Sequence, residues 1–284
     1  QGLTGRHDTI TGATEGQLSG ARVQGLNAGG VQLQSGQLSD VAARYSQFDG
    51  SEARVGAAEV NGLQTEAGSL EHGRVEGAEV AQDALGNLEA RLESAGLRGA
   101  SSGDHSLEGA QLDGLRLALD RHGVSSGELS EAQISGFASR HFGNLDLARV
   151  EGLSGQSDGT THQASLDYAE IQGAQRGDDR LESASVSNAQ ARVVQGEDRR
   201  SVEASLGSLS ASGLSGQAEL ESAQIDGLQL SGSQDAQGTH GTGSVDSARV
   251  RGAMYEQYDL GALDLANASG SAALDAQGAL SSAS

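Results

Sequence analysis

The sequence predicts an all-β protein, a tandem-repeat β-solenoid, with a long antiparallel β-meander as the alternative. Three observations favour this fold class. One eight-residue motif recurs in register along the chain, its apolar positions alternate with polar ones, and the composition is rich in glycine, with 43 Gly and no Pro, Cys or Trp among 284 residues. Aromatic residues make up only 2% of the chain, so a thick core of large side chains is excluded and a thin one of small side chains is expected.

The motif is defined by LESAQIDG, residues 220–227: Leu, polar, small, Ala, polar, Val/Ile/Leu, polar, Gly. One series of matches begins at Leu18, Val55, Leu92, Leu129, Leu166, Leu206 and Val245. A second series begins at Leu33, Leu70, Leu107, Leu145, Leu181, Leu220 and Leu260. The motifs alternate at about 15 and about 22 residues, which defines a unit of about 37 residues that carries two motifs and recurs seven times.

The motif indicates strand rather than helix. Ala223, Ile225 and Gly227 are two residues apart, which places them on one face of a strand but on nearly opposite sides of a helix. Glycine inside a helix also costs about 1 kcal/mol relative to Ala. The leading Leu and the Val/Ile/Leu position are an odd number of residues apart, so in a regular strand they would lie on opposite faces. We therefore expect a bend of the chain between them. The expected buried residues are Ala110, Leu112, Ala223 and Ile225, and the expected solvent-facing ones are Gln111 and Gln224.

Two other interpretations compete locally. Residues 81–97 and the segment near Arg116 can be drawn as amphipathic helices, but the motif continues through both at unchanged spacing. High Gly, Ser and Gln with few aromatic residues is also typical of disorder, which does not require regularly spaced aliphatic residues. The regular motif therefore favours strands.

The repeat also predicts how the chain is organised. One unit has too little apolar surface to fold alone, so the units must stack on one another. Two motifs per unit give about 18 residues per coil, as in a β-helical coil, whereas a meander would make each unit a hairpin. Residues 1–17 are expected to be an N-terminal tail or capping segment, and residues 18–284 a seven-unit β-repeat domain. The spacing slips near residues 196–205 and 232–244, where we expect longer loops.

Charge restricts the possible partners. The formal net charge is -21 and all basic residues are Arg, so phosphate-rich nucleic acids and anionic membranes are disfavoured. No apolar run is long enough to span a bilayer, and the chain has no Cys for disulfides or thiolate metal sites. The expected partners are further copies of the chain or another protein, with no nucleic acid and no membrane span.

No catalytic, cofactor-binding or metal site is predicted. The pattern G-x-S-x-G occurs at residues 99–103, 123–127 and 155–159, but a nucleophile elbow needs a strand before it and a helix after it, so these are interpreted as turns. The acidic residues 178–179 and 197–198 lack the spacing of a calcium loop, and Asn267 begins a lone glycosylation sequon. The seven histidines are scattered: His7, His72, His105, His122, His141, His162 and His240.

Alternating charges are the remaining pattern. Stacked strands are expected to align Arg and acidic residues in ladders along an outer face, which would be solvated or would supply partner contacts. The residues concerned are Arg22, Arg54, Arg74, Arg149, Arg249, Glu76, Glu151, Glu170 and Asp226.

The expected function is that of a non-enzymatic structural or interaction protein: a secreted or cell-surface β-repeat rod, fibre segment or adhesin-like stalk that self-assembles. The alternative is a lipid-handling or carrier scaffold with an open β groove, since the Gly-punctuated alternation of residues 258–280 is generically similar to that of bacterial lipid-bridge proteins. An enzyme that uses one face of a solenoid, as some polysaccharide lyases do, is a third possibility.

Overall fold

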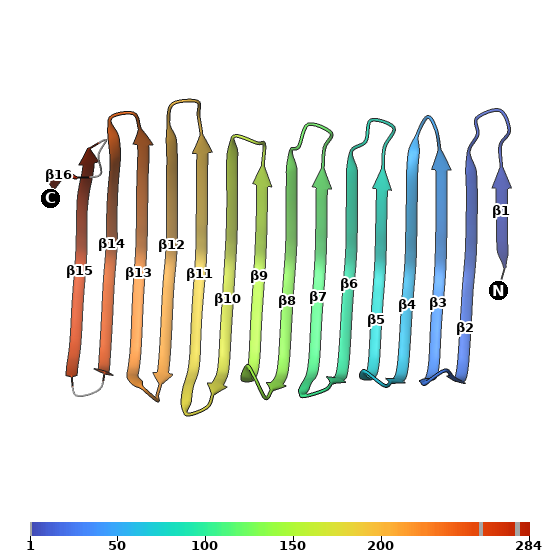
Figure 1. Cartoon of the computed structure of the whole chain (residues 1–284), viewed down its shortest axis with the longest axis horizontal. Helices are drawn as coiled ribbons and strands as arrows, with labels where there is room; N and C mark the ends of the chain where they lie inside the picture. Colours follow the sequence, from blue (N-terminus) through green and yellow to red (C-terminus); the bar gives the residue numbers. More distant parts are fainter. Residues whose placement is uncertain (1, 256–257, 276–278) are drawn as a thin grey trace. The chain divides into compact units, whose positions relative to one another are not determined.

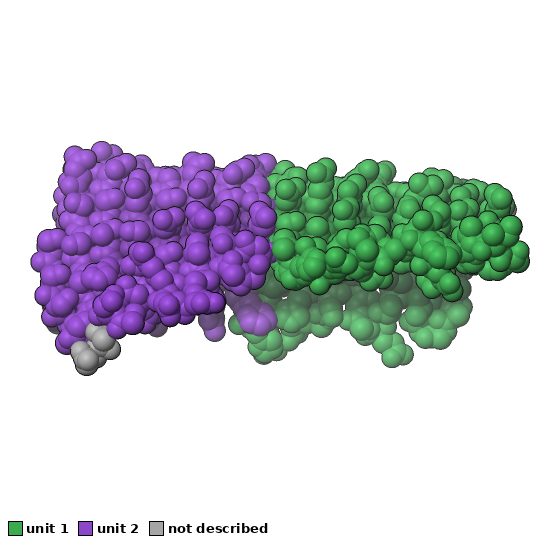
Figure 2. All heavy atoms as spheres, turned by 90° about the horizontal axis from the view of Figure 1, so that it is seen from above, with its two compact units in different colours: residues 1–141 green, residues 142–284 purple. Residues whose placement is uncertain are grey.

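The computed structural model describes residues 2–255, 258–275 and 279–284, and these residues form strands and turns without a helix. The chain divides into two compact units, residues 1–141 and residues 142–284 (Figure 2). The strands of the first unit are β1 (Leu3–His7), β2 (Thr14–Ala28), β3 (Val31–Ser46), β4 (Gly50–Thr65), β5 (Gly68–Gln82), β6 (Leu88–Ser102), β7 (His105–Leu119) and β8 (Ser125–Ser139). The strands of the second are β9 (Gly143–Ser157), β10 (Thr161–Arg176), β11 (Asp179–Gln195), β12 (Arg200–Leu214), β13 (Ala218–Asp235), β14 (Gly238–Tyr255), β15 (Tyr258–Asp275) and β16 (Leu280–Ala283).

Each unit is an antiparallel meander in which strands pair in the order of the sequence (Figure 1). The all-β prediction is therefore confirmed, and the observed topology is the meander that the sequence left as the alternative. A solenoid would pair equivalent strands in parallel, whereas every pairing between the described strands of each unit is antiparallel. Each 37-residue unit corresponds to two such strands. Within residues 1–17, β1 pairs with the first residues of β2.

The alternating motif spacing arises because the motif lies off-centre in its strand. Gly96, the fifth motif residue of β6, is 15 residues before Gln111 of β7 across a two-residue turn, since 111 minus 96 is 15. It is 22 residues after Arg74 of β5 across residues 83–87, since 96 minus 74 is 22.

The prediction of longer loops at residues 196–205 and 232–244 was wrong. The extra residues lengthen β11 to 17 residues and β13 and β14 to 18, and the connections are residues 196–199 and 236–237.

The eighth motif residue is where each strand bends. In β2 to β15, all fourteen residues at this position have a φ between 51° and 67°, in the left-handed region. Eleven are Gly, and the other three are Asp40, Asn188 and Asn267, of residue types that tolerate this conformation better than other side chains do. Asn267 of the sequon thus occupies a bend position. The sequence predicted a bend between the first and sixth motif residues, whereas the left-handed residue lies at the eighth.

The bend also requires a close approach between strands. The eighth residue of one strand lies against the second motif residue of its neighbour: a Cβ added to Gly99 would lie 2.4 Å from Cγ of Glu71, and one added to Gly77 would lie 2.3 Å from Cγ of Glu93. Gly at this position therefore suits the left-handed backbone, and beside Glu71 or Glu93 it also leaves space for the side chain of the neighbouring strand.

The sheet has almost no core. Among the described residues, Ala273 is the one buried hydrophobic side chain. Ala110, Leu112, Ala223 and Ile225 are half-buried while Gln111 and Gln224 are exposed, so the predicted register is confirmed but the predicted depth of burial was wrong. The reason is that within each unit a strand contacts only its neighbours in the sequence, so no second layer covers either face. The chain exposes 18,057 Å², whereas a compact monomer of this mass exposes roughly 11,000 Å².

Candidate functional site

The candidate functional surfaces are the two faces of the sheet, which the motif keeps chemically distinct. Side-chain hydrogen bonds between neighbouring strands, such as Ser183–Ser212 and Ser185–Ser210, place the third, fifth and seventh positions on one face, here called the polar face. The fourth and sixth positions lie on the opposite one, called the apolar face.

The first motif residue belongs to the apolar face as well. A Cβ added to Gly73, a fourth-position residue, would lie 3.0 Å from Cδ2 of Leu70, the first residue of the same motif. Antiparallel pairing then adds the residue after the bend, position nine, because it lies opposite a first residue, as Leu228 lies opposite Leu206. In all fourteen strands from β2 to β15, positions one, four, six and nine are Gly, Ala, Val, Leu, Ile or Phe. The sequence analysis missed position nine, although its apolar residue follows the eighth motif residue in every strand.

The polar face carries ladders of hydrogen-bonding side chains. Fifth-position residues lie opposite one another in successive strands, as in the series Gln37, Glu59 and Arg74. Arg22 donates to Gln37 at 2.9 Å, and Arg74 pairs with Glu76 on its own strand. These contacts are exposed, so each contributes little to stability.

The second unit continues this pattern. Arg149 lies opposite Glu170 and pairs with Glu151 at 2.7 Å, and Arg251 contacts Asp264 at 2.9 Å. Hydrogen bonds from Gln224 and Ser247, with the nearby charge of Arg249, lower the pKa of Asp226. Of the other predicted ladder residues, Arg54 lies opposite Glu79 outside the motif, so the ladders involve more residues than the sequence analysis named.

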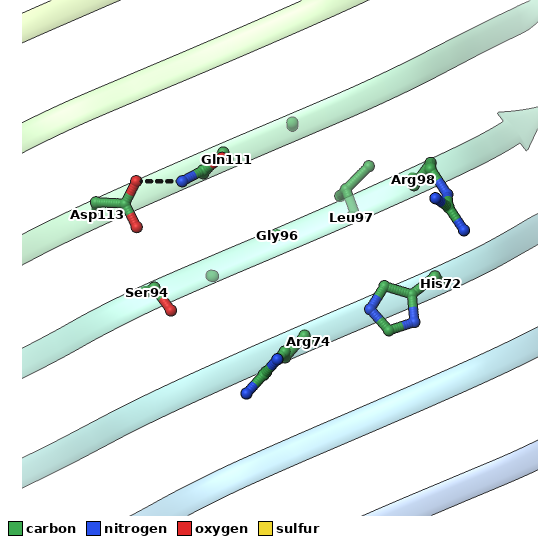
Figure 3. Close-up of a pocket in the computed structure, with 10 residues that line it drawn as sticks. His72, Arg74, Ser94, Gly96, Leu97, Arg98, Gln111 and Asp113 are labelled. Carbon is green, nitrogen blue, oxygen red and sulfur yellow. Dashed lines mark hydrogen bonds between the residues drawn. The ribbon is translucent and has the colours of Figure 1, made fainter.

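A shallow depression interrupts the polar face where Gly96 takes the place of a long fifth-position side chain (Figure 3). Its volume is about 390 Å³, with His72, Arg74 and Arg98 on one side and Gln111 and Asp113 on the other. The Gln111 amide donates to Asp113 at 2.6 Å. Within the described part of the chain Arg98 has no hydrogen bond or ion pair, so its guanidinium is free to bind an acceptor. The mixture of cations, amide and carboxylate suits a small polar group.

The apolar face is open to solvent. On the second unit, Ile171, Leu209 and Leu230 are 42%, 39% and 50% exposed. On the first unit this face contains a shallow depression of about 620 Å³. Its lining combines Ala43, Tyr45, Ala53, Val80 and Leu88 with the charged residues Glu15, Arg44 and Glu52.

The chemical motifs of the sequence fall in turns and strand ends. The three G-x-S-x-G segments span the end of β6 and its turn, a turn and the start of β8, and the end of β9 and its turn, and no helix follows any of them. Residues 197 and 198 lie in a turn, and Asp179 accepts a hydrogen bond from the backbone N–H of Gln217 at 3.1 Å. Among the described residues, no group of three or more His, Asp or Glu could hold a metal ion.

Aspartates close several of the longer turns. Asp8, Asp83 and Asp158 each accept backbone N–H groups through Oδ1, for example from Leu85 to Asp83 at 2.8 Å. Backbone hydrogen bonds lower the pKa of Asp8 and Asp158, and the side chain of Asn87, with backbone bonds, lowers the pKa of Asp83. These perturbed carboxylates are exposed turn caps, which explains their pKa shifts without a catalytic role.

The described residues include no helix that is long and apolar enough to cross a membrane. No family model, curated protein or solved structure matches the chain.

Proposed function

We propose that this chain is a non-enzymatic structural or interaction protein, a secreted or cell-surface β-repeat segment of a rod, fibre or adhesin-like stalk that associates with copies of itself or with a protein partner. The observation that carries the proposal is the uncovered apolar face, which the motif maintains in every strand from β2 to β15. A surface of this extent is typical of an interaction site in a soluble protein.

The repeat architecture supports the same function. Each added pair of strands extends both faces without altering the rest, so binding surface grows in proportion to length. The negative charge supports solubility of the free chain and opposes unordered aggregation.

Sedimentation velocity and negative-stain electron microscopy over a range of protein concentrations test this proposal. We expect association to increase with concentration and to give ordered particles of uniform width. A monodisperse monomer under all conditions, with no partner recovered from the native source, would contradict it. Protease treatment of intact source cells would test the proposed surface location.

A lipid-handling scaffold is the second candidate, and the depression lined by Tyr45, Val80 and Leu88 favours it. Its volume of about 620 Å³ is within the range of small-molecule sites, about 300–1,000 Å³, and these three side chains supply apolar lining. Mass spectrometry of the purified protein should then find bound lipid in a fixed molar ratio. Protein free of lipid that also fails to bind a fluorescent fatty acid would exclude this function.

A further inference from the structure

We propose that the apolar face is an interface between copies of this chain: the apolar face of a second copy packs on it, and the two sheets form a two-layer sandwich with both polar faces outward. This inference rests on the proposed self-association and specifies its surface. It is argued from the area that is left uncovered, from the small and large residues of the face and from the distribution of charge.

The area is sufficient for a stable interface. The chain exposes 18,057 Å², about 7,000 Å² more than a compact monomer of its mass. A standard protein–protein interface needs about 800 Å² from each partner. The excess exposed area of the chain is therefore several times what one such interface requires.

The apolar face has rows of small and rows of large side chains, an arrangement that can pack against a second sheet. Pairing places an Ala beside a Val, Leu or Ile at several positions, as for Ile225 and Ala248, whereas on its other side Ile225 lies opposite Leu209. The row Ala169, Val186, Leu209 and Ile225 contains one small and three large residues, and Ile171, Ala184, Ala211 and Ala223 on its neighbouring row are mostly small. Two packed sheets interdigitate their inner side chains at a separation of about 10 Å, which requires such rows of ridges and hollows.

The distribution of charge favours a second copy. At positions one, four, six and nine no strand from β2 to β15 carries a charged residue, so packing these four positions against a second copy desolvates no ionised side chain. The Arg, Glu and Asp ladders remain on the outer faces. Because the partner is the same chain, the interface can be isologous, which is the commonest arrangement of soluble dimers.

A pair of variants on one strand tests the proposal. Leu209 and Ser210 are adjacent in β12, Leu209 on the apolar face and Ser210 on the polar face, where it bonds Ser185. Leu209→Asp and Ser210→Asp add the same charge to opposite faces. Sedimentation equilibrium should show that Leu209→Asp raises the dissociation constant at least about tenfold, because the charge would be buried without a partner, while Ser210→Asp associates like the parent.

A milder pair covers the case in which Leu209→Asp fails to fold, as judged by circular dichroism. The chain has no Cys, so Leu209→Cys and Ser210→Cys each give a single site for an environment-sensitive thiol dye. The emission of the dye at residue 209 should shift to the blue as the concentration rises, and that at residue 210 should not change.

The remaining outcomes separate the two proposals. Association that is equal in both aspartate variants, with an unshifted dye at residue 209, would place the contact elsewhere and overturn this inference while the proposed function stands. A monomer at all concentrations would overturn this inference, and it would overturn the proposed function as well if no partner were recovered from the native source. A monomer whose dye at residue 209 shifts only with phosphatidylcholine vesicles would replace the second copy by lipid.

Discussion

At the scale of single residues, the glycine at the bend is the most sensitive position of the repeat. Gly99 has a φ of +61° and faces Glu71, whereas Gly96, three residues earlier in β6, has ordinary backbone and a nearest contact of 3.7 Å for an added Cβ. We expect Gly99→Ala to lower the free energy of unfolding by about 1–2 kcal/mol through left-handed strain alone. Gly96→Ala should leave it unchanged or raise it by up to about 1 kcal/mol. Urea unfolding measures both, and equal effects would show that the bend tolerates a side chain.

The turn aspartates predict the acid sensitivity of the fold. Their pKa values are lower in the folded chain than in the unfolded chain, so the unfolded chain binds more protons as the pH falls. Their contribution to stability is present above the unfolded pKa of about 3.9 and is lost as the pH falls through the folded pKa. Thermal melts between acidic and neutral pH should show this loss. Asp83→Asn, which keeps an acceptor oxygen but cannot ionise in this range, should reduce the slope, and an unchanged slope would argue against the cap.

At the scale of strands, stability should be local. Ile225 of β13 lies between Leu209 of β12 and Ala248 of β14 and contacts no other layer. Ile225→Asp is expected to speed amide hydrogen exchange in β12–β14 and to leave β2–β7 protected, because each strand is stabilised by its neighbours. Gln224→Asp, the adjacent residue on the polar face, is the matched control. Uniform loss of protection along the chain would show that the repeat unfolds as one cooperative unit.

The edges of the sheet are a second feature at this scale. β1 pairs with only Thr14–Leu18 of β2, and β16 with only Ala272–Leu274 of β15. Among the described residues, the outer edge of β2 from residue 20 to 28 and that of β15 from residue 258 to 270 have no strand partner, which is an opportunity for pairing with another chain. This edge is the alternative contact that the variants at Leu209 and Ser210 distinguish from the apolar face.

At the scale of the whole molecule, secondary structure is the first check. Strands account for 84% of the described residues, so far-UV circular dichroism should be dominated by strand signal. A helical content above about one third of the residues, a proportion typical of average globular proteins, would contradict the fold.

Salt should strengthen self-association. The net charge of -21 makes separate copies repel one another, while positions one, four, six and nine of the proposed interface carry no charge. Raising the ionic strength from about 0.01 M to about 1 M shortens the screening length from about 30 Å to about 3 Å. The dissociation constant measured by sedimentation should therefore fall with added salt. If salt weakened association, ion pairs rather than apolar contacts would hold the copies together.

The sequence by itself determined the strands, their two faces and the position of each repeat. Period-two alternation within the motif and a Gly, Asp or Asn at every eighth position act on the local backbone, so residues such as Ala223, Gln224 and Gly227 could be assigned before any strand was paired. The sequence also predicted a bend between Leu220 and Ile225, whereas the left-handed residue of this motif is Gly227, which follows them.

Only the tertiary structure decided how the strands are joined and how deeply they are covered. Parallel coils and antiparallel hairpins satisfy the same alternation, so the choice of the meander depends on which strands become neighbours. Ile225 is half-buried rather than buried because no second layer packs on its face, and no residue of the motif encodes the presence or absence of that layer. The tertiary structure also placed position nine on the apolar face. The side on which this residue lies depends on the left-handed bend before it and on the residue opposite, as for Leu228 beside Leu206.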